Sequence, residues 1–154
     1  MKKNGSLLLA ALMVFSIANI KIFAHAEGTG VSSYEELVSA VQAAQGETHI
    51  VLEDSFIFET KGAEPQITVK AGNRVVLEAG ERGVILSHGT GGEMFFVEDG
   101  ASLVLEGHEN AAITLRETVM TEEWAESCIV ADGKIEARNV VMEGFYAASS
   151  TARL

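Results

Sequence analysis

The sequence predicts an all-β solenoid, in which parallel strands stack as a coil, with one α-helix at its N-terminal end. Three observations indicate this fold: a single helix-forming segment, strand-like alternation after it, and a repeated pattern of apolar residues and glycine. With 154 residues, 47% of them apolar, the chain is long enough for one domain and too apolar to be wholly disordered.

Residues 1–26 have the three parts of a secretory signal peptide. Lys2 and Lys3 form a basic start, an almost uninterrupted apolar run follows from Leu7 to Ala18, and Ala24-His25-Ala26 is a small-x-small cleavage site. The run is shorter than the ~20 apolar residues of a membrane-spanning helix. We therefore expect a secreted or cell-surface protein whose mature chain has no transmembrane segment.

The segment from Val31 to Ala44 is the one expected helix of the mature chain. Ser33 and Glu36 form a capping box, in which the Ser33 hydroxyl accepts from the Glu36 N–H and Glu36 reaches back to the Ser33 N–H. An apolar stripe follows at spacings of three and four, at Leu37, Ala40, Val41 and Ala44, and Gly46 is the expected stop. Since only strands follow, this stripe should cover the end of a sheet structure.

After the helix the apolar period changes to two. Short strands are expected at 49–52 and 56–58, and a longer pattern then repeats. Ile67-x-Val69-x-x-Gly72-x-x-Val75-x-Leu77 matches Phe95-x-Val97-x-x-Gly100-x-x-Leu103-x-Leu105 at an offset of 28. A third copy, Cys128-x-Val130-x-x-Gly133-x-Ile135-x-Ala137, starts 33 residues later and is one residue shorter after its glycine. Each copy is followed by a further strand-like pair of alternating apolar residues, at Val84/Leu86, Ile113/Leu115 and Val140/Met142.

Stacked copies would bring equivalent side chains together. Ile67, Phe95 and Cys128 would form one row and Val69, Val97 and Val130 another. Gly72, Gly100 and Gly133 follow the strands where a left-handed or otherwise strained corner is expected. The Asp-Gly pairs at 99–100 and 132–133 could also form two-residue antiparallel hairpins, which makes a β-sandwich the alternative fold.

Charge and cysteine content exclude several classes of function. The chain has 11 basic and 22 acidic residues, a net charge of −11, which becomes −14 over 128 residues once residues 1–26 are removed. Such a surface repels phosphate backbones, so no nucleic-acid partner is expected. The single cysteine, Cys128, can form neither an internal disulfide nor a CxxC pair. We expect it to be buried and to pack as a small apolar residue rather than as a reactive thiol.

The order of these segments resembles a known family. The helix VSSYEELVSAVQAA, the strand HIVLEDSF and the repeats FFVEDGASLVLEG and IVADGKIEARNVVMEG are similar to the N-terminal portion of right-handed parallel β-helix proteins. This pectate-lyase-like superfold is shared by bacterial adhesin-like surface proteins and polysaccharide-degrading enzymes. The resemblance covers roughly residues 31–144. It implies that the helix caps the open end of the coil and that Arg138-Asn139 is a tight turn.

The predicted organisation is a signal peptide (1–26), an N-terminal segment with the capping helix (27–46) and β-helix coils (47–154). About three copies are few for a solenoid, which needs roughly three repeats and caps. Residues 147–154 contain neither a second capping helix nor a polar closing strand. We therefore expect the coil to be incomplete at its C-terminal end, as part of something longer.

Candidate functional residues are sparse, and no catalytic residue or metal-ligating motif is predicted. Trp124 lies beside Glu122, Glu123 and Glu126, the one combination of an aromatic platform with carboxylates, and these four are the candidate ligand-binding residues. The alternative is that Trp124 anchors its loop. No cofactor is expected, although the acidic clusters could bind Ca²⁺, which favours several carboxylate oxygens on flexible loops.

The histidines also admit two interpretations. His88 and His108 lie in glycine-rich segments and would approach one another if the copies are in register, but no HxH or HExxH spacing is present. We expect both to be solvated loop residues.

The function predicted from the sequence is a secreted or cell-surface β-helix scaffold that contacts glycans or host or cell-surface proteins without catalysis. The alternative is the N-terminal part of a polysaccharide lyase or glycoside hydrolase whose active groove lies outside this chain. A further alternative is a small secreted protein that dimerises end to end and hides its open disc.

Overall fold

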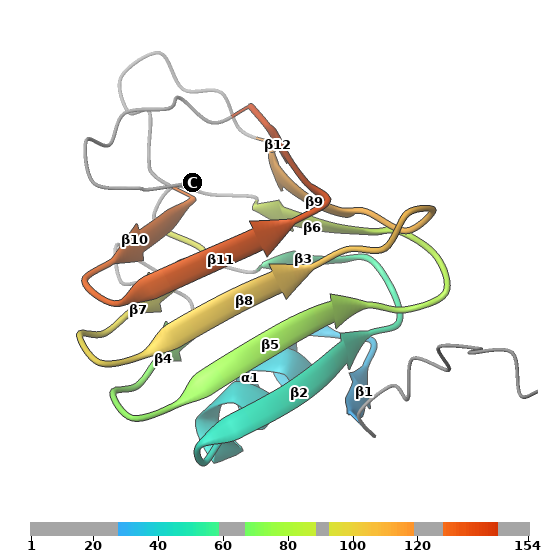
Figure 1. The fold of residues 1–154 in the computed structure, drawn as a ribbon. Coiled ribbons are helices and arrows are strands. Elements are labelled where there is room, and N and C mark those ends of the chain that lie inside the picture. Colours follow the sequence, from blue (N-terminus) through green and yellow to red (C-terminus); the bar gives the residue numbers. More distant parts are fainter. Residues whose placement is uncertain (1–27, 59–66, 89–92, 119–127, 145–154) are drawn as a thin grey trace, which may run out of the picture.

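The computed structural model describes residues 28–58, 67–88, 93–118 and 128–144. These residues form one short helix and twelve strands (Figure 1). Trp124, Glu122, Glu123 and Glu126 lie outside the described residues, as do residues 1–26. The elements in chain order are β1 (Thr29–Val31), α1 (Tyr34–Ala43), β2 (Glu47–Leu52), β3 (Phe56–Phe58), β4 (Ile67–Val69), β5 (Arg74–Ala79), β6 (Val84–His88), β7 (Phe95–Val97), β8 (Ser102–Glu106), β9 (Ile113–Glu117), β10 (Ile129–Ala131), β11 (Lys134–Arg138) and β12 (Val140–Glu143).

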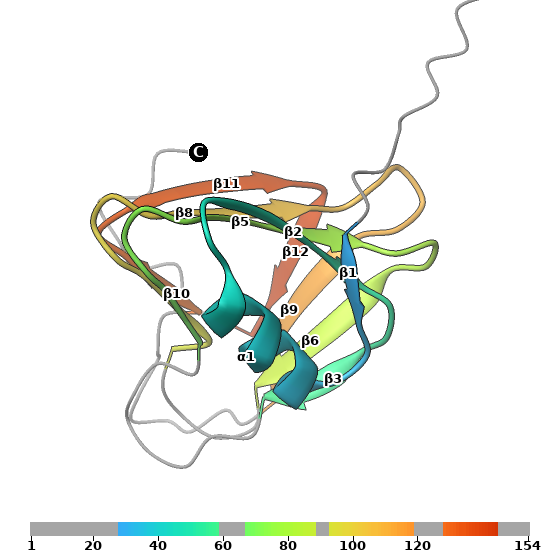
Figure 2. The same ribbon diagram turned by 90° about the horizontal axis from the view of Figure 1, so that it is seen from below.

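The strands form three parallel sheets that surround one core (Figure 2). The first sheet has the order β1-β2-β5-β8-β11, the second β12-β9-β6-β3 and the third β10-β7-β4. From β2 onward each strand pairs in parallel with the strand three places later, so one turn of chain supplies one strand to each sheet. The protein is thus predominantly β, with parallel sheets, an arrangement compatible with a β-solenoid.

The 28-residue offset is confirmed by the register of the sheets. Ile67 pairs with Phe95 in the third sheet, and Leu77 pairs with Leu105 in the first. The return strands also align as expected, since Val84 pairs with Ile113. The β-sandwich alternative is wrong, because β7 and β8 on the two sides of Gly100 lie in different sheets and do not form a hairpin.

The third copy is shifted from the expected register. Ile129, not Cys128, pairs with Phe95, and Ala131, not Val130, pairs with Val97. The corner that follows is therefore two residues shorter than in the copy before, since β11 keeps Ile135 opposite Leu103. Gaps in a repeat can be placed in more than one way from sequence, and backbone pairing decides between them.

The expected helix forms, but it is shorter than predicted. It begins after its N-cap Ser33, whose hydroxyl accepts from the Glu36 N–H at 3.3 Å. Glu36 reaches back to the Ser32 N–H at 2.7 Å rather than to Ser33. The predicted stripe covers the end of the coil, with Leu37 fully buried, and the helix contacts β1, β3 and β4.

Val31 belongs to a strand rather than to the helix. In β1 it pairs with Leu52, so β1 extends the first sheet by one strand that the sequence pattern did not reveal. The strand is short and contains Gly30, where an added Cβ would meet the Glu53 side chain. The Glu53 carboxylate thus occupies the space beside Gly30 that a larger residue would need.

Two of the three corner glycines are left-handed as predicted. Gly72 has φ +83° and Gly100 has φ +77°, where an L side chain is strained. Gly133 does not have a left-handed φ, so it is the other kind of corner that was expected, a strained one. Instead, a Cβ on Gly133 would lie 2.6 Å from the Ala101 carbonyl oxygen, so this tighter corner needs glycine for space. Asn139, with φ +48°, forms the expected tight turn between β11 and β12.

The core is a stack of apolar rows. Ile50, Leu77 and Leu105 are paired in succession along the first sheet, and each is fully buried. Burial of each such side chain contributes roughly 1.5–3 kcal/mol. The stack is covered by α1 at one end, whereas at the other Met142 is 54% exposed although its partner Leu115 is buried. Within the described segments, no helix has the length and apolar character needed to cross a membrane.

Candidate functional site

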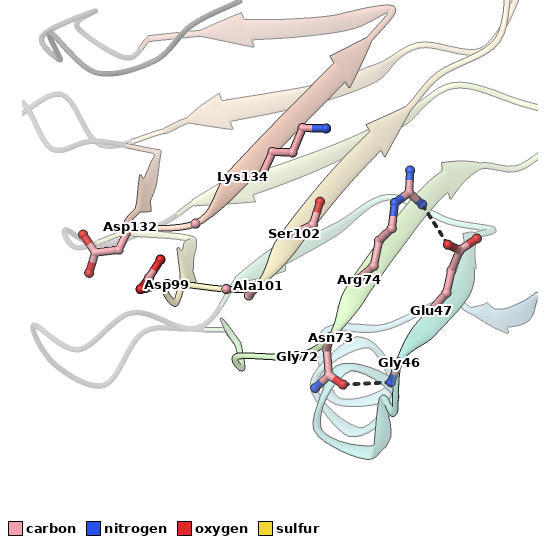
Figure 3. Close-up of a pocket in the computed structure, with 12 residues that line it drawn as sticks. Gly46, Glu47, Gly72, Asn73, Arg74, Asp99, Ala101, Ser102, Asp132 and Lys134 are labelled. Atoms are coloured by element: carbon pink, nitrogen blue, oxygen red, sulfur yellow. Dashed lines mark hydrogen bonds and ion pairs between the residues drawn. The ribbon is translucent and has the colours of Figure 1, made fainter.

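A shallow groove lined by glycines and by charged and polar residues follows the corner between the third and first sheets, where each turn of chain enters the first sheet (Figure 3). Its volume is about 620 Å³. One side is a row made of the first residue of each of the strands β2, β5, β8 and β11. These residues are paired in register, and they are Glu47, Arg74, Ser102 and Lys134. Neighbouring members of the row are separated by the strand spacing of about 4.8 Å. Four successive turns of chain therefore contribute to one continuous surface.

Charges of both signs line this groove. The Arg74 guanidinium lies 3.7 Å from the Glu47 carboxylate, and the Lys134 ammonium lies 2.8 Å from Glu136. The hydrogen bond from Lys134, helped by its charge, lowers the pKa of Glu136. Asp99 and Asp132 stand on the turn side of the groove, across from the strand residues (Figure 3).

Side chains tie the backbone of adjacent turns together along this corner. The Asn73 carboxamide oxygen accepts the Gly46 N–H at 3.0 Å, and the Glu98 carboxylate accepts the Ala71 N–H at 2.8 Å. These bonds satisfy backbone donors that the strands leave free at the turns. The groove wall is consequently held in place by the same contacts that hold the coil together.

The Ser102 hydroxyl is a polar group of the groove that the protein itself leaves unused. Its oxygen is buried and has no hydrogen-bond partner among the described residues. An unsatisfied buried hydroxyl costs about 1–3 kcal/mol, which a ligand or water could recover. This side chain lies midway along the row, between Arg74 and Lys134.

A second group of chemically active side chains lies inside the coil. His88, at the end of β6, is fully buried, and its Nδ1 lies 3.0 Å from Glu117 Oε2 at the end of β9. Its Nε2 is also buried and has no partner in the described structure. Cys128 Sγ lies 3.5 Å from Met94 Sδ. Burial, and then the charge of Glu117, raise the pKa of the Cys128 thiol, which therefore stays protonated.

The expectations for the histidines are corrected by these contacts. His88 is a core residue, not a solvated loop residue, because β6 extends to it and its side chain alternates inward with Val84 and Leu86. His108 lies at another corner, after β8, where its Nε2 is 3.1 Å from Glu78 Oε1. The two histidines are therefore not brought together.

Cys128 is buried as predicted, although it sits one position outside the expected register. The candidate ligand-binding residues Trp124, Glu122, Glu123 and Glu126 lie outside the described part of the chain. Among residues 28–58, 67–88, 93–118 and 128–144, no group of three or more potential ligands could hold a metal ion. The calcium expectation for the 122–126 cluster stays a prediction.

The groove row was missed in the sequence, although a signal for it existed. Arg74 and Ser102 immediately precede the matched residues Val75 and Leu103, so the 28-residue offset already aligned them. Comparison with protein-family models, curated proteins and solved structures finds no match to this chain. The functional argument therefore rests on the geometry of the groove.

Proposed function

We propose that this protein is a secreted or cell-surface scaffold that binds an extended ligand along its lateral groove, without catalysis. In this proposal the coil is a right-handed parallel β-helix of the pectate-lyase-like superfold, and residues 1–26 are its signal peptide. The ligand is a glycan chain or an extended segment of a host or cell-surface protein.

The in-register row of Glu47, Arg74, Ser102 and Lys134 carries this proposal. The row places one polar or charged side chain at each turn of chain, at a constant spacing, which suits an extended ligand. The mixed charges provide polar contacts along it. The wall is rigid because strands build it, so little ordering entropy opposes binding.

Binding of the full chain to arrays of glycans and matrix proteins tests the proposal. The double variant R74A/D99A removes one charge of each sign from the groove and should weaken binding of any selected ligand by about tenfold. The matched control is R82A/E109A, which removes the same charges from exposed residues in the turns that follow β5 and β8, at the corner between the first and second sheets. Equal losses in both variants, or cleavage of a polysaccharide by the wild type, would contradict the proposal.

A further inference from the structure

The end of the coil formed by β10, β11 and β12 is an open surface in the described structure (Figure 1). Among the described residues, each of these strands pairs on one side only, with β7, β8 and β9 respectively. Within the described part of the chain their outer edges have no strand partner, and the N–H and C=O groups of such an edge favour pairing with another strand. The inward-facing side chains of these last strands are partly exposed as well. Ile135 and Val140 are half-buried, whereas their partners in the preceding turn, Leu103 and Ile113, are fully buried.

The charges on the outer face of β11 alternate in sign. Asp132 precedes the strand, and Lys134, Glu136 and Arg138 follow at every second position, all outside the core. Such a series is complementary to itself when two copies run antiparallel. Lys134 then faces Glu136 of the partner subunit and Arg138 faces Asp132 of the partner subunit, and each pair occurs twice.

Only one antiparallel register satisfies every member of this series. Pairing centred on Glu136 would place Lys134 opposite Arg138 of the partner subunit, with like charges. A shift of one residue would place inward side chains against outward ones. Pairing centred on Ile135 places Ile135 opposite its own copy on the inward face. It also places each of the four charged side chains opposite one of the other sign.

We propose that two copies of this chain associate through their β11 edges, antiparallel and centred on Ile135, as a two-fold dimer. Such an interface is isologous, as in most homodimers. In cross-section the first sheet forms one side of a triangle (Figure 2). A two-fold axis through the middle of that side places β12 over β10 of the other copy. The half-buried Val140 and the exposed Met142 then cover Ile129 and Ala131 of the partner subunit.

Sedimentation equilibrium of the full chain should reveal a reversible dimer. K134E places like charges opposite one another twice and should weaken the dimer by about tenfold, and K134E/E136K should restore it by exchanging the two charges. The matched control K70E, at an exposed turn residue two coils away, should leave the dissociation constant unchanged. A monomeric wild type, or a swap that does not restore association, would overturn the proposal.

Cross-linking tests the register independently of charge. In the proposed dimer Ile135 faces its own copy, with Cα atoms about 5.5 Å apart, which is within the range of disulfides, whereas Ala137 faces Gly133 of the partner subunit. I135C should therefore form a disulfide-linked dimer on mild oxidation, and A137C should remain largely unlinked. Association without a link at I135C, as in a head-to-tail arrangement through β1 or a continuation of the coil over β11, would refute this register. Neither experiment depends on ligand binding in the groove.

Discussion

Cys128 shows how the interior of the coil controls the chemistry of a single side chain. Burial raises the pKa of its thiol, and the nearby Glu117 carboxylate raises it further. A thiol with a raised pKa has a smaller thiolate fraction near neutral pH, and the thiolate is the reactive species. The residue therefore serves as a packing partner of Met94.

Labelling of Cys128 with a thiol reagent at neutral pH should be at least about tenfold slower in the folded chain than in urea. The unfolded chain is the internal control, because it contains the same single cysteine with its ordinary pKa. Rapid modification of the folded protein would contradict the assignment of Cys128 to the core.

The His88–Glu117 pair is a polar exception inside an otherwise apolar stack. Its members are opposite each other at the last positions of β6 and β9, two residues beyond the paired Leu86 and Leu115. Burial of such a pair without solvent is costly, and its partners depend on each other. The pair thus links two turns of chain through one contact of 3.0 Å.

Replacement of one member should cost more than replacement of both. Glu117→Leu leaves the His88 imidazole without its partner and should lower the free energy of unfolding by about 1–3 kcal/mol. The double variant H88L/E117L removes both polar groups and should recover part of that loss. Urea unfolding of the wild type, both single variants and the double variant measures the coupling, and additive losses would contradict it.

At the scale of elements, the corner glycines have two different physical roles. Gly100 has a left-handed φ, and a Cβ added to it would meet open space. Gly133 has an ordinary φ, and there is too little space for a Cβ. The difference follows from the shorter corner before β11, which brings this turn against the Ala101 carbonyl.

Substitutions by alanine and asparagine should separate these roles. Gly100→Ala should cost about 1–2 kcal/mol, and Gly100→Asn less, because asparagine tolerates the left-handed region. At Gly133 the order reverses, since the larger side chain overlaps more, and even alanine should cost about 1–3 kcal/mol. Denaturant unfolding of the four variants provides the comparison, and the same order at both positions would be inconsistent with it.

The helix and β1 show when a local sequence pattern is sufficient to predict an element. A capping box and a stripe at Leu37, Ala40, Val41 and Ala44 involve neighbours in sequence, so the helix was predicted to within three residues at its N-terminal end. The first strand, β1, has three residues and no alternation of its own. It forms because it pairs with the edge of β2, and this contact cannot be predicted from the residues of β1 alone.

At the scale of the whole molecule, stability should vary along the stack. Each turn of chain contacts its neighbours, so the central strands β5 and β8 are supported on both sides and the last strands on one. Local opening requires less free energy where fewer neighbours are lost.

Hydrogen exchange should therefore be slowest in β5 and β8 and faster in β10, β11 and β12 when the dimer is dissociated. At concentrations that favour the dimer, protection should rise selectively in β11, because its outer edge gains partners. Exchange that is uniform along the stack, at low and high concentration alike, would contradict both the stacking argument and the dimer. K134E, measured at the higher concentration, provides the monomer reference.

The sequence alone determined the helix, the parallel strands, the 28-residue offset and two of the three left-handed corners. These depend on local periodicity and on repetition, which can be read from residue order. Tertiary structure decided the shift of β10, the burial of His88 against Glu117, the role of Gly133 and the row of Glu47, Arg74, Ser102 and Lys134. These features arise where different turns of chain meet, and backbone hydrogen bonds and close packing, rather than residue order, set which atoms come into contact there.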